Sequence, residues 1–521
     1  MRSSPLALTG HSDTDSRNRL GRAHRAASPA RPFFGEEKAK TMAIDRKTLA
    51  TFTATLLSGA ALLATACSDD GAAPSDPQGG GGGGGSGNLP LEQIFAAELD
   101  IADDLRGVSI ADSDVIYVCG NSDQDGDPVI VVARLSSDGN LDQSFGEGGK
   151  VTINTIAAAE DHEDAGAPGD EQTDAVASLS DGGAALVVTR NDGELGDEVV
   201  VVRLSEEGEL VENFGDAGIA RVPLTDWEPG AEWESAGGSA EPNSVAYDLA
   251  LDTSSGEDRL VVFGKAPARK KSGRVDEDRY IVRILADSGE LDETFADDGV
   301  FSIDFGEKAG PDEARRGLVR EDGSIVSSGY TFYDTVRHHI FLLGLDPDGK
   351  PIDEMGFVDP ESDCGQTQAG VICMNPFIGS GYAEAYAVAV QDDGSFVTTG
   401  YGEPSSGSST EQDLVSFRFG ESAFDSGYGI SGGAIFDSGA EDRGRDLVSL
   451  PDGRLAHVGM YQGKAAIYLT TPDGTLSESF GQSGVADFPT IDGTFWSVAA
   501  GEEQMVAVGD DALVAIYRFR D

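Results

Sequence analysis

Short hydrophobic runs separated by turn residues fill the chain from about residue 104 onward. One stretch has apolar runs at 175–179, 184–188 and 198–203, with Asp181-Gly182 between the first two and a further run at 219–222. Val-rich runs bounded by Gly and Asp are typical of buried strands. Asp-Gly pairs favour tight hairpin turns, because Gly accepts positive φ without steric cost. The pattern therefore predicts an antiparallel unit of four strands.

This unit recurs along the chain. An apolar run that ends in Arg is followed by Gly, Leu, Phe-Gly and Gly at 133–149 and 202–218. The same frame recurs at 283–299 with Leu291, Asp292 and Phe295, and it returns at 469–484 without the Arg. Weaker copies lie at 343–357 and 417–433, and a half-copy at 515–519 ends the chain. Repeats of this length indicate a solenoid or a propeller, and a closed ring hides the strand edges that an open stack would expose. We predict an all-β fold, a seven-bladed β-propeller of four-stranded blades over residues 91–521. No helical pattern occurs among the units, which argues against α/β folds.

The frame resembles the bacterial delta-60 repeat, whose hallmark is an Arg-ended apolar strand followed by Asp-Gly, Leu-Asp, Phe-Gly and Gly. Four copies match well and cover much of residues 104–519 once the intervening strands are counted. The resemblance implies an extracytoplasmic β-propeller, in a group mostly without an assigned activity. Recurrence at equivalent positions favours a role in building blades over a role in one site, and it applies to Arg134, Arg203, Arg283, Phe145, Phe214, Phe295 and Phe480.

The two ends of the repeated region complement each other. The last unit stops at Asp521 without a fourth strand, whereas the segment 94–100 ahead of the first unit aligns with 434–437. We predict that residues 92–97 complete the final blade. The alternative is a disordered N-terminal tail.

Charge separates a leader from the body. The 521 residues include 92 Asp+Glu and 37 Lys+Arg, a net charge of −55, yet residues 1–67 carry an excess of Lys and Arg. Residues 1–41 show no apolar period, and we interpret them as an extension upstream of a start at Met42. Residues 42–66 have Arg46 and Lys47 before a short apolar stretch, which is typical of a signal peptide; a retained anchor helix is the alternative.

The residues that end this leader, 63–67, resemble the processing site of bacterial lipoproteins. The resemblance implies that Cys67 is acylated and becomes the N-terminus, although the Leu that the family prefers lies one position early, at Leu63, with Ala64 in its place. Residues 67–90 would then form a Gly-rich, flexible tether. We therefore expect an extracytoplasmic protein, lipid-anchored to the bacterial cell envelope at the outer membrane.

Two further sets of residues are candidates for covalent or metal chemistry. We interpret Cys364 and Cys373 as a disulfide, as expected in an oxidising compartment. A metal site would need two more ligands nearby, and none is evident in the sequence. Asn121, Asp123, Asp125 and Asp127 resemble the oxygen-rich start of a calcium loop, but Val132 stands where an EF-hand has Glu. Calcium is thus a candidate ligand, and a solvated acidic turn is the alternative.

The sequence narrows the function without naming a ligand. A strongly acidic body argues against a nucleic-acid partner, since phosphate binding needs clustered Lys and Arg. No nucleophile elbow or metalloprotease helix motif occurs. We expect a monomeric binding or scaffold module for an envelope protein or polysaccharide, without catalytic activity. The alternatives are a propeller hydrolase or lyase with a metal in the central channel, and a structural envelope component. Inward-facing His and carboxylates would favour the enzyme, whereas small or apolar residues would favour binding.

Overall fold

The computed structural model describes residues 89–520, except for gaps at 112, 125–126, 156–169, 192–196, 225–243, 270–274, 306–311, 333–337, 359–363, 365–367, 378–380, 404–411 and 431. By its contacts the chain divides into Met1–Gly82 and Gly83–Asp521, and every described residue belongs to the second unit. All regular elements of the described part are β-strands. The same part contains no helix with the length and apolarity that crossing a membrane requires.

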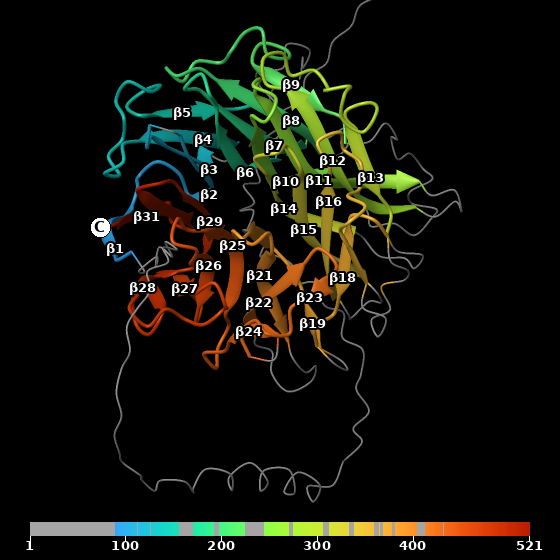
Figure 1. The fold of residues 1–521 in the computed structure, drawn as a ribbon. Coiled ribbons are helices and arrows are strands. Elements are labelled where there is room, and N and C mark those ends of the chain that lie inside the picture. Colours follow the sequence, from blue (N-terminus) through green and yellow to red (C-terminus); the bar gives the residue numbers. More distant parts are fainter. Residues whose placement is uncertain are drawn as a thin grey trace, which may run out of the picture. The chain divides into compact units, whose positions relative to one another are not determined.

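Seven sheets follow one another around a ring, which Figure 1 shows from blue through green to red. Blade 1 contains β2 (Asp104–Ile110), β3 (Ile116–Gln124), β4 (Asp127–Leu135) and β5 (Lys150–Ile153). Blade 2 contains β6 (Asp170–Ser178), β7 (Ala184–Asn191), β8 (Asp197–Leu204) and β9 (Ile219–Val222). Blade 3 contains β10 (Val245–Asp252), β11 (Arg259–Arg269), β12 (Val275–Leu285) and β13 (Val300–Ile303).

The second half of the ring has four more blades. Blade 4 contains β14 (Asp312–Val319), β15 (Ile325–Phe332), β16 (His338–Leu345), β17 (Gly356–Val358) and β18 (Val371–Met374). Blade 5 contains β19 (Tyr382–Ala383), β20 (Ala387–Val390), β21 (Phe396–Glu403), β22 (Asp413–Gly420), β23 (Ala423–Phe424) and β24 (Gly433–Phe436). Blade 6 contains β25 (Arg443–Ser449), β26 (Leu455–Tyr461), β27 (Lys464–Thr470) and β28 (Val485–Asp492). Blade 7 contains β29 (Phe495–Ala500), β30 (Gln504–Gly509), β31 (Leu513–Phe519) and β1 (Leu91–Glu98).

The predicted seven-bladed, all-β propeller is confirmed, with additions in two blades. In blade 4 the short strand β17 pairs in parallel with β18, which extends the sheet to five strands. In blade 5 both the first and the last strand are split, so that β19 and β20 pair with β21 while β23 and β24 pair with β22. These two blades hold the weakest copies of the sequence repeat, and the extra residues there interrupt the regular ladder.

The ring closes through the N-terminal strand. β1 pairs antiparallel with β31, from Leu91 opposite Phe519 to Glu98 opposite Leu513. Figure 1 shows the two strands side by side at the junction of the first and last blades. The predicted strand at 92–97 is therefore confirmed and extends one residue further at each end. Pairing covers the edge of β31 that would otherwise be exposed.

Aromatic rings and glycines pack together where neighbouring blades meet. A Cβ added at Gly208 of blade 2 would lie 3.1 Å from the ring of Phe145 in blade 1, and the φ of Gly208 is +84°. The same close approach joins Phe214 to Gly289 and Phe295 to Gly349. The Gly of these turns is thus required by its backbone conformation and by its neighbour. Phe480 of blade 6 packs against Tyr517 of blade 7, with ring centroids 5.3 Å apart.

The repeated arginines also reach from one blade to the next. Arg134 donates to the carbonyl oxygen of Glu206, Arg203 to that of Ala286 at 2.5 Å, and Arg283 to that of Pro347 at 2.8 Å. Within their own blades, Arg134 and Arg283 also bond Asp142 and Asp292 at 2.9 Å and 2.8 Å. Hydrogen bonds from a charged donor are stronger than neutral ones. Each of these arginines therefore joins two blades.

Candidate functional site

A β-bulge interrupts the first strand of the blades where these strands surround the axis. The first strands of neighbouring blades contact one another around the whole ring. Register shifts leave one residue unpaired in five of them, namely Arg106, Asp174, Tyr247, Arg445 and Trp496. In blade 4 the shift spans Arg315 and Arg316, and in blade 5 Tyr386 lies in the break between β19 and β20. A bulge turns a side chain out of the ladder and is frequent beside functional sites.

These bulge residues surround one cavity of about 200 Å³, which we call the bulge chamber. Every blade contributes to it, since the chamber is lined by Arg106, Gln172, Asp174, Tyr247, Arg315, Arg316, Tyr386, Arg445 and Trp496. Four of these nine residues are Arg, in a chain that has only 37 Lys+Arg among 521 residues. Cationic side chains are therefore concentrated here against the trend of the composition.

Guanidinium groups and aromatic rings alternate around the bulge chamber. The guanidinium carbon of Arg445 lies 4.7 Å from the centre of the Trp496 ring and 4.9 Å from that of Tyr386. Arg315 lies 4.7 Å from the Tyr386 ring, and Arg106 lies 4.0 Å from the Trp496 ring. Such contacts attract the cation to the face of the ring. They hold the arginines in place without using their N–H donors.

The arginines differ in the acceptors available to them. Arg106 forms an ion pair with Asp104 at 2.6 Å, and Arg315 donates to the Tyr330 hydroxyl at 2.7 Å. Arg445 has no hydrogen bond or ion pair with any described residue, and its buried Nε is unpaired. A buried donor without an acceptor is unfavourable. The N–H groups of Arg445 are therefore available to a ligand that brings a hydrogen-bond acceptor into the chamber.

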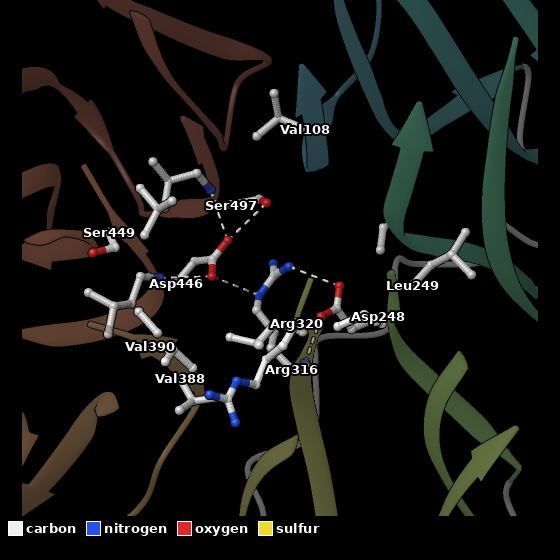
Figure 2. A pocket seen from close by; sticks show the side chains of 18 of the residues that line it. Val108, Asp248, Leu249, Arg316, Arg320, Val388, Val390, Asp446, Ser449 and Ser497 are labelled. Atoms are coloured by element: carbon white, nitrogen blue, oxygen red, sulfur yellow. Dashed lines mark hydrogen bonds and ion pairs between the residues drawn. The ribbon is translucent and has the colours of Figure 1, made fainter. Parts of the chain in front are cut away.

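Arg316 crosses the axis at the floor of the bulge chamber. From blade 4, its Nη2 donates to the carbonyl oxygen of Trp496 in blade 7 at 2.8 Å. Its guanidinium group also forms ion pairs with Asp248 of blade 3 at 3.4 Å and Asp446 of blade 6 at 3.5 Å. Figure 2 shows Arg316 between the two carboxylates. This network closes the channel between two chambers.

The carboxylates of this network are also held by the backbone. Asp446 accepts hydrogen bonds from the amide of Val498 at 2.9 Å and the hydroxyl of Ser497 at 3.0 Å, and Asp248 accepts one from the amide of Gly317 at 2.9 Å. Burial raises the pKa of Asp248 to about 6, although Arg316 acts in the opposite direction. Burial likewise raises the pKa of Asp446. Both groups therefore support Arg316 and are not free to bind a ligand in this arrangement.

A larger cavity of about 850 Å³ lies on the other side of Arg316. We call it the apolar chamber after the ring of Val and Leu to which every blade contributes: Val108, Val176, Leu249, Leu318, Val388, Leu447 and Val498. Polar and charged residues line it as well, namely Arg320, Glu321, Asp322, Gln391, Asp392 and Ser449. Along every first strand the Val or Leu of this ring follows the bulge residue, so the two chambers are stacked along the axis with Arg316 between them. Among the described lining residues of both chambers there is no His or Cys.

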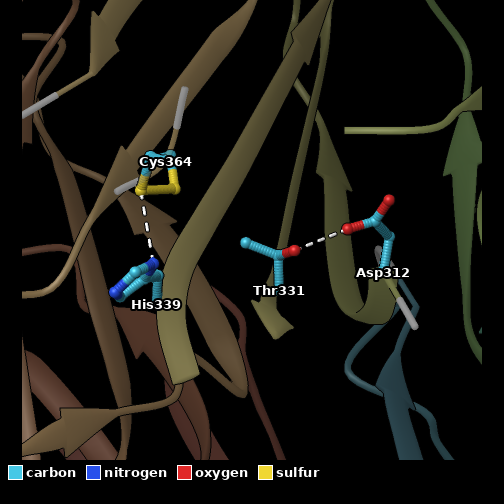
Figure 3. Close-up of a disulfide and its surroundings, with 5 residues drawn as sticks. Asp312, Thr331, His339 and Cys364 are labelled. Carbon is cyan, nitrogen blue, oxygen red and sulfur yellow. Dashed lines mark hydrogen bonds between the residues drawn. A yellow bond between two sulfur atoms is a disulfide. The ribbon is translucent and has the colours of Figure 1, made fainter. Parts of the chain in front are cut away.

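The predicted disulfide is present, and it lies away from the channel. Cys364 is bonded to Cys373, and both are buried. The Nδ1 atom of His339 lies 3.5 Å from the Cys364 sulfur (Figure 3). The neighbouring His338 instead contacts Glu384. The two adjacent histidines thus face different surroundings, as the alternation of a strand requires.

Only part of the calcium candidate set lies among the described residues. Asn121 and Asp123 are on β3, where Asp123 pairs with Pro128 of β4 and Gln124 pairs with Asp127. The Oδ1 atom of Asn121 accepts a hydrogen bond from the amide of Thr173 at 2.9 Å, and its Nδ2 donates to Asp104 at 3.2 Å. Asn121 is therefore used between blades 1 and 2. Asp125 and the side chain of Asp127 lie outside the described residues, and so does Cys67; calcium binding and acylation stay predictions.

The sequence contains a signal for the bulge chamber that the repeat analysis did not use. In each unit Arg, Asp, Tyr or Trp precedes a small residue or Asp and then Val or Leu, as in Arg106-Gly107-Val108, Tyr386-Ala387-Val388 and Trp496-Ser497-Val498. The second and third positions keep their character from unit to unit, whereas the first changes between Arg, Asp, Tyr and Trp. A position that varies within an otherwise regular repeat is where a ring of repeats builds a specific site.

The fold and the site thus define a seven-bladed β-propeller whose axis contains a polar chamber and an apolar chamber. Residues 114–145 match the family described as "Domain of unknown function (DUF5122) beta-propeller". This supports a β-propeller repeat protein. No curated protein matches the chain.

Solved propellers resemble this chain in fold. Polysaccharide lyase Uly1 is 11% identical, with 81% of this chain and 91% of that chain covered and a TM-score of 0.42. Catalytically inactive virginiamycin B lyase from Staphylococcus aureus, crystallised with quinupristin, is 8% identical over 82% and 100% of the two chains, with a TM-score of 0.38. Sqt1 from Chaetomium thermophilum is 12% identical over 82% and 98%, with a TM-score of 0.39. The likeness concerns the fold alone and carries no argument about activity.

Proposed function

We propose that this protein is a non-catalytic binding module of the bacterial cell envelope that takes a small ligand in its central channel. One observation carries the proposal. Seven units that share one frame of strands contribute different bulge side chains, and these converge on one chamber. Identical blades would need no such variety for stability, whereas a specific ligand requires a specific set of contacts.

The lining of the channel favours binding over catalysis. The apolar chamber presents a ring of Val and Leu, and the carboxylates of Asp248 and Asp446 are engaged by Arg316 and by backbone amides. A metal bound by Asp248 and Asp446 would have to displace Arg316. General acid–base catalysis needs a titratable group within reach of the substrate. Asp248 and Asp446 already have partners, so in the alternative function, a hydrolase or lyase, this role would fall to Asp174, Glu321, Asp322 or Asp392.

The envelope location in this proposal is supported by the disulfide. Structural disulfides persist in oxidising compartments, and Cys364–Cys373 is buried in blade 4. Acylation of Cys67 belongs to the same proposal. In Gram-negative bacteria producing the full chain, a labelled fatty acid should be incorporated and the chain should fractionate with the outer membrane. Cys67→Ala should lose both the label and the membrane association. A Cys67→Ala chain that kept the label would contradict the anchor.

Ligand binding can be tested by saturation-transfer-difference NMR on the full chain. The probe is a mixture of envelope-type monosaccharides, sugar acids and amino acids. Gln172→Trp would obstruct the bulge chamber and Ser449→Trp the apolar chamber, while Thr475→Trp is an exposed control on blade 6. We expect one obstructing variant to lose the signal and the control to keep it. Absence of binding by the wild-type chain, retention of the signal by both obstructing variants, or cleavage of a saccharide during the experiment would overturn the proposal.

A further inference from the structure

We infer that the bulge chamber binds a small hydroxylated carboxylate, such as a sugar acid, and that Arg445 holds its carboxylate group. This inference names the ligand class for the proposed binding function and rests on it. It depends on three features of the chamber: an unsatisfied cation, acceptors on the opposite wall, and a restricted size.

The first feature is the state of Arg445. The rings of Tyr386, Tyr401 and Trp496 lie 4.9, 5.6 and 4.7 Å from its guanidinium carbon, so the group is fixed in position. None of its N–H groups has an acceptor among the described residues. A planar guanidinium with free donors matches the two oxygens of a carboxylate.

A second guanidinium group reinforces this side of the chamber. Arg315 and Arg445 both lie over the ring of Tyr386, at 4.7 and 4.9 Å, and the Nε of Arg315 is also buried without a partner. Arg315 is partly neutralised by Glu313 at 4.0 Å, and Glu313 is itself paired with Lys265 at 2.9 Å. The side chains of Arg315, Tyr386 and Arg445 from blades 4, 5 and 6 therefore form a cationic wall. On this wall Arg315 has a carboxylate partner, whereas Arg445 has none among the described residues.

The opposite wall offers acceptors. Blade 2 contributes Asp174 and Gln172, whose side chains are 3.1 Å apart. A carboxylate and an amide oxygen accept hydrogen bonds from hydroxyl groups. A ligand that spans the chamber would thus place its carboxylate on Arg445 and its hydroxyls on Asp174 and Gln172. A simple fatty acid has no hydroxyl groups, so it would donate no hydrogen bond to Asp174 or Gln172.

The size of the chamber restricts the ligand further. Its volume of about 200 Å³ lies below the roughly 300 Å³ at which sites for drug-sized ligands begin. Arg316 closes the floor, so the ligand cannot extend into the apolar chamber while the Arg316 network is intact. One sugar-sized unit fits these limits, either free or as the end of a longer molecule.

Isothermal titration calorimetry of the full chain tests the inference with four probes: glucuronate, glucose, acetate and inorganic phosphate. Glucuronate and glucose differ in the carboxylate, whereas acetate lacks the hydroxyl groups. We expect glucuronate to bind at least about tenfold more tightly than the other three, because a charge-assisted hydrogen bond contributes that much. Arg445→Gln should weaken glucuronate about tenfold or more, and Arg445→Lys should weaken it less. Arg520→Gln removes an exposed Arg paired with Glu92 and should have no effect.

Each contrary result has a distinct meaning. Equal affinity of wild-type and Arg445→Gln for glucuronate, with both proteins folded by circular dichroism, would overturn the role of Arg445. Equal affinity for glucose and glucuronate would show that the chamber does not recognise the carboxylate group. Equal affinity for phosphate and glucuronate would show that it does not prefer a carboxylate to other anions. If glucuronate does not bind but glucose or a compound of the NMR mixture does, this inference fails and the proposed binding function survives. If none of the four probes and no compound of the NMR mixture binds, the binding function itself fails.

Discussion

Arg316 and Trp496 are joined across the axis of the ring by a 2.8 Å hydrogen bond from the Arg316 guanidinium to the Trp496 carbonyl oxygen. The two residues are 180 positions apart in the sequence and belong to blades 4 and 7. Because the same guanidinium is paired with Asp248 and Asp446, four blades meet at one side chain. The bond separates the polar chamber from the apolar one.

Replacing Arg316 should destabilise the ring. Arg316→Gln leaves the carboxylates of Asp248 and Asp446 buried without a counterion, and breaking a buried pair in this way costs about 3–5 kcal/mol. Urea unfolding of the variant at neutral pH measures the loss. In an Asp248→Asn/Asp446→Asn background the same replacement should cost much less. An equal loss in both backgrounds would show that the ion pairs are not the cause.

Asp248 should make the protein less stable as the pH rises. Burial raises its pKa to about 6 in the folded chain, above the value of about 3.9 for an unfolded Asp. Its contribution is therefore fully present below about pH 4 and is lost as the pH rises through 6, by up to roughly 3 kcal/mol. Asp248→Asn should remove this component from the free energy of unfolding measured between pH 4 and 7. Identical pH profiles for wild-type and variant would refute it.

His457 should act in the opposite direction. It is fully buried on β26, with its Nε2 3.2 Å from the Thr470 hydroxyl, and burial lowers its pKa to about 3. An unfolded His takes up its proton near pH 6.5, so stability is present above that pH and is lost as the pH falls toward 3, by as much as roughly 5 kcal/mol. His457→Leu should flatten the acid limb of the unfolding curve. If the variant retains the wild-type acid sensitivity, another group is responsible.

Removing β1 should open the ring. Deletion of residues 88–99 takes away the strand that pairs with β31 and exposes that edge, which favours aggregation. We expect a markedly lower melting temperature in differential scanning calorimetry. Deletion of residues 76–87, which precede the strand, is the matched control and should leave the melt unchanged. Similar melting of both deletion variants and wild-type would contradict closure by β1.

Gly208 and Gly394 separate backbone strain from packing between blades. Both have a φ near +83°, but a Cβ at Gly208 meets Phe145 and Gly146, whereas a Cβ at Gly394 has no neighbour within 4 Å. Gly394→Ala should cost about 1 kcal/mol from the backbone conformation alone. Gly208→Ala should cost about 1–3 kcal/mol more, because the added methyl overpacks the blade junction. Urea unfolding compares the two, and equal losses would refute the packing role.

The sequence predicted correctly those features whose signal lies within a single repeat. The Val-rich runs, the Asp-Gly turns and the recurring Arg and Phe are local or equivalent in every unit, so they determined the strands, the seven blades and the closing strand at 92–97. The repeat did not predict the details of blades 4 and 5, because insertions there add β17 and split the strands next to Tyr386 and Phe424. Periodicity cannot predict how an extra residue is accommodated in a ladder.

The sequence by itself therefore determined a ring of seven four-stranded blades and the disulfide candidate Cys364–Cys373. Only the tertiary structure decided that Arg106, Arg445 and Trp496 share a chamber and that Arg316 closes it. The physical reason is that the bulge residues belong to different repeats, far apart in the sequence, so no local pattern links them. Their chemistry becomes common only when the ring brings seven separate strands to one axis.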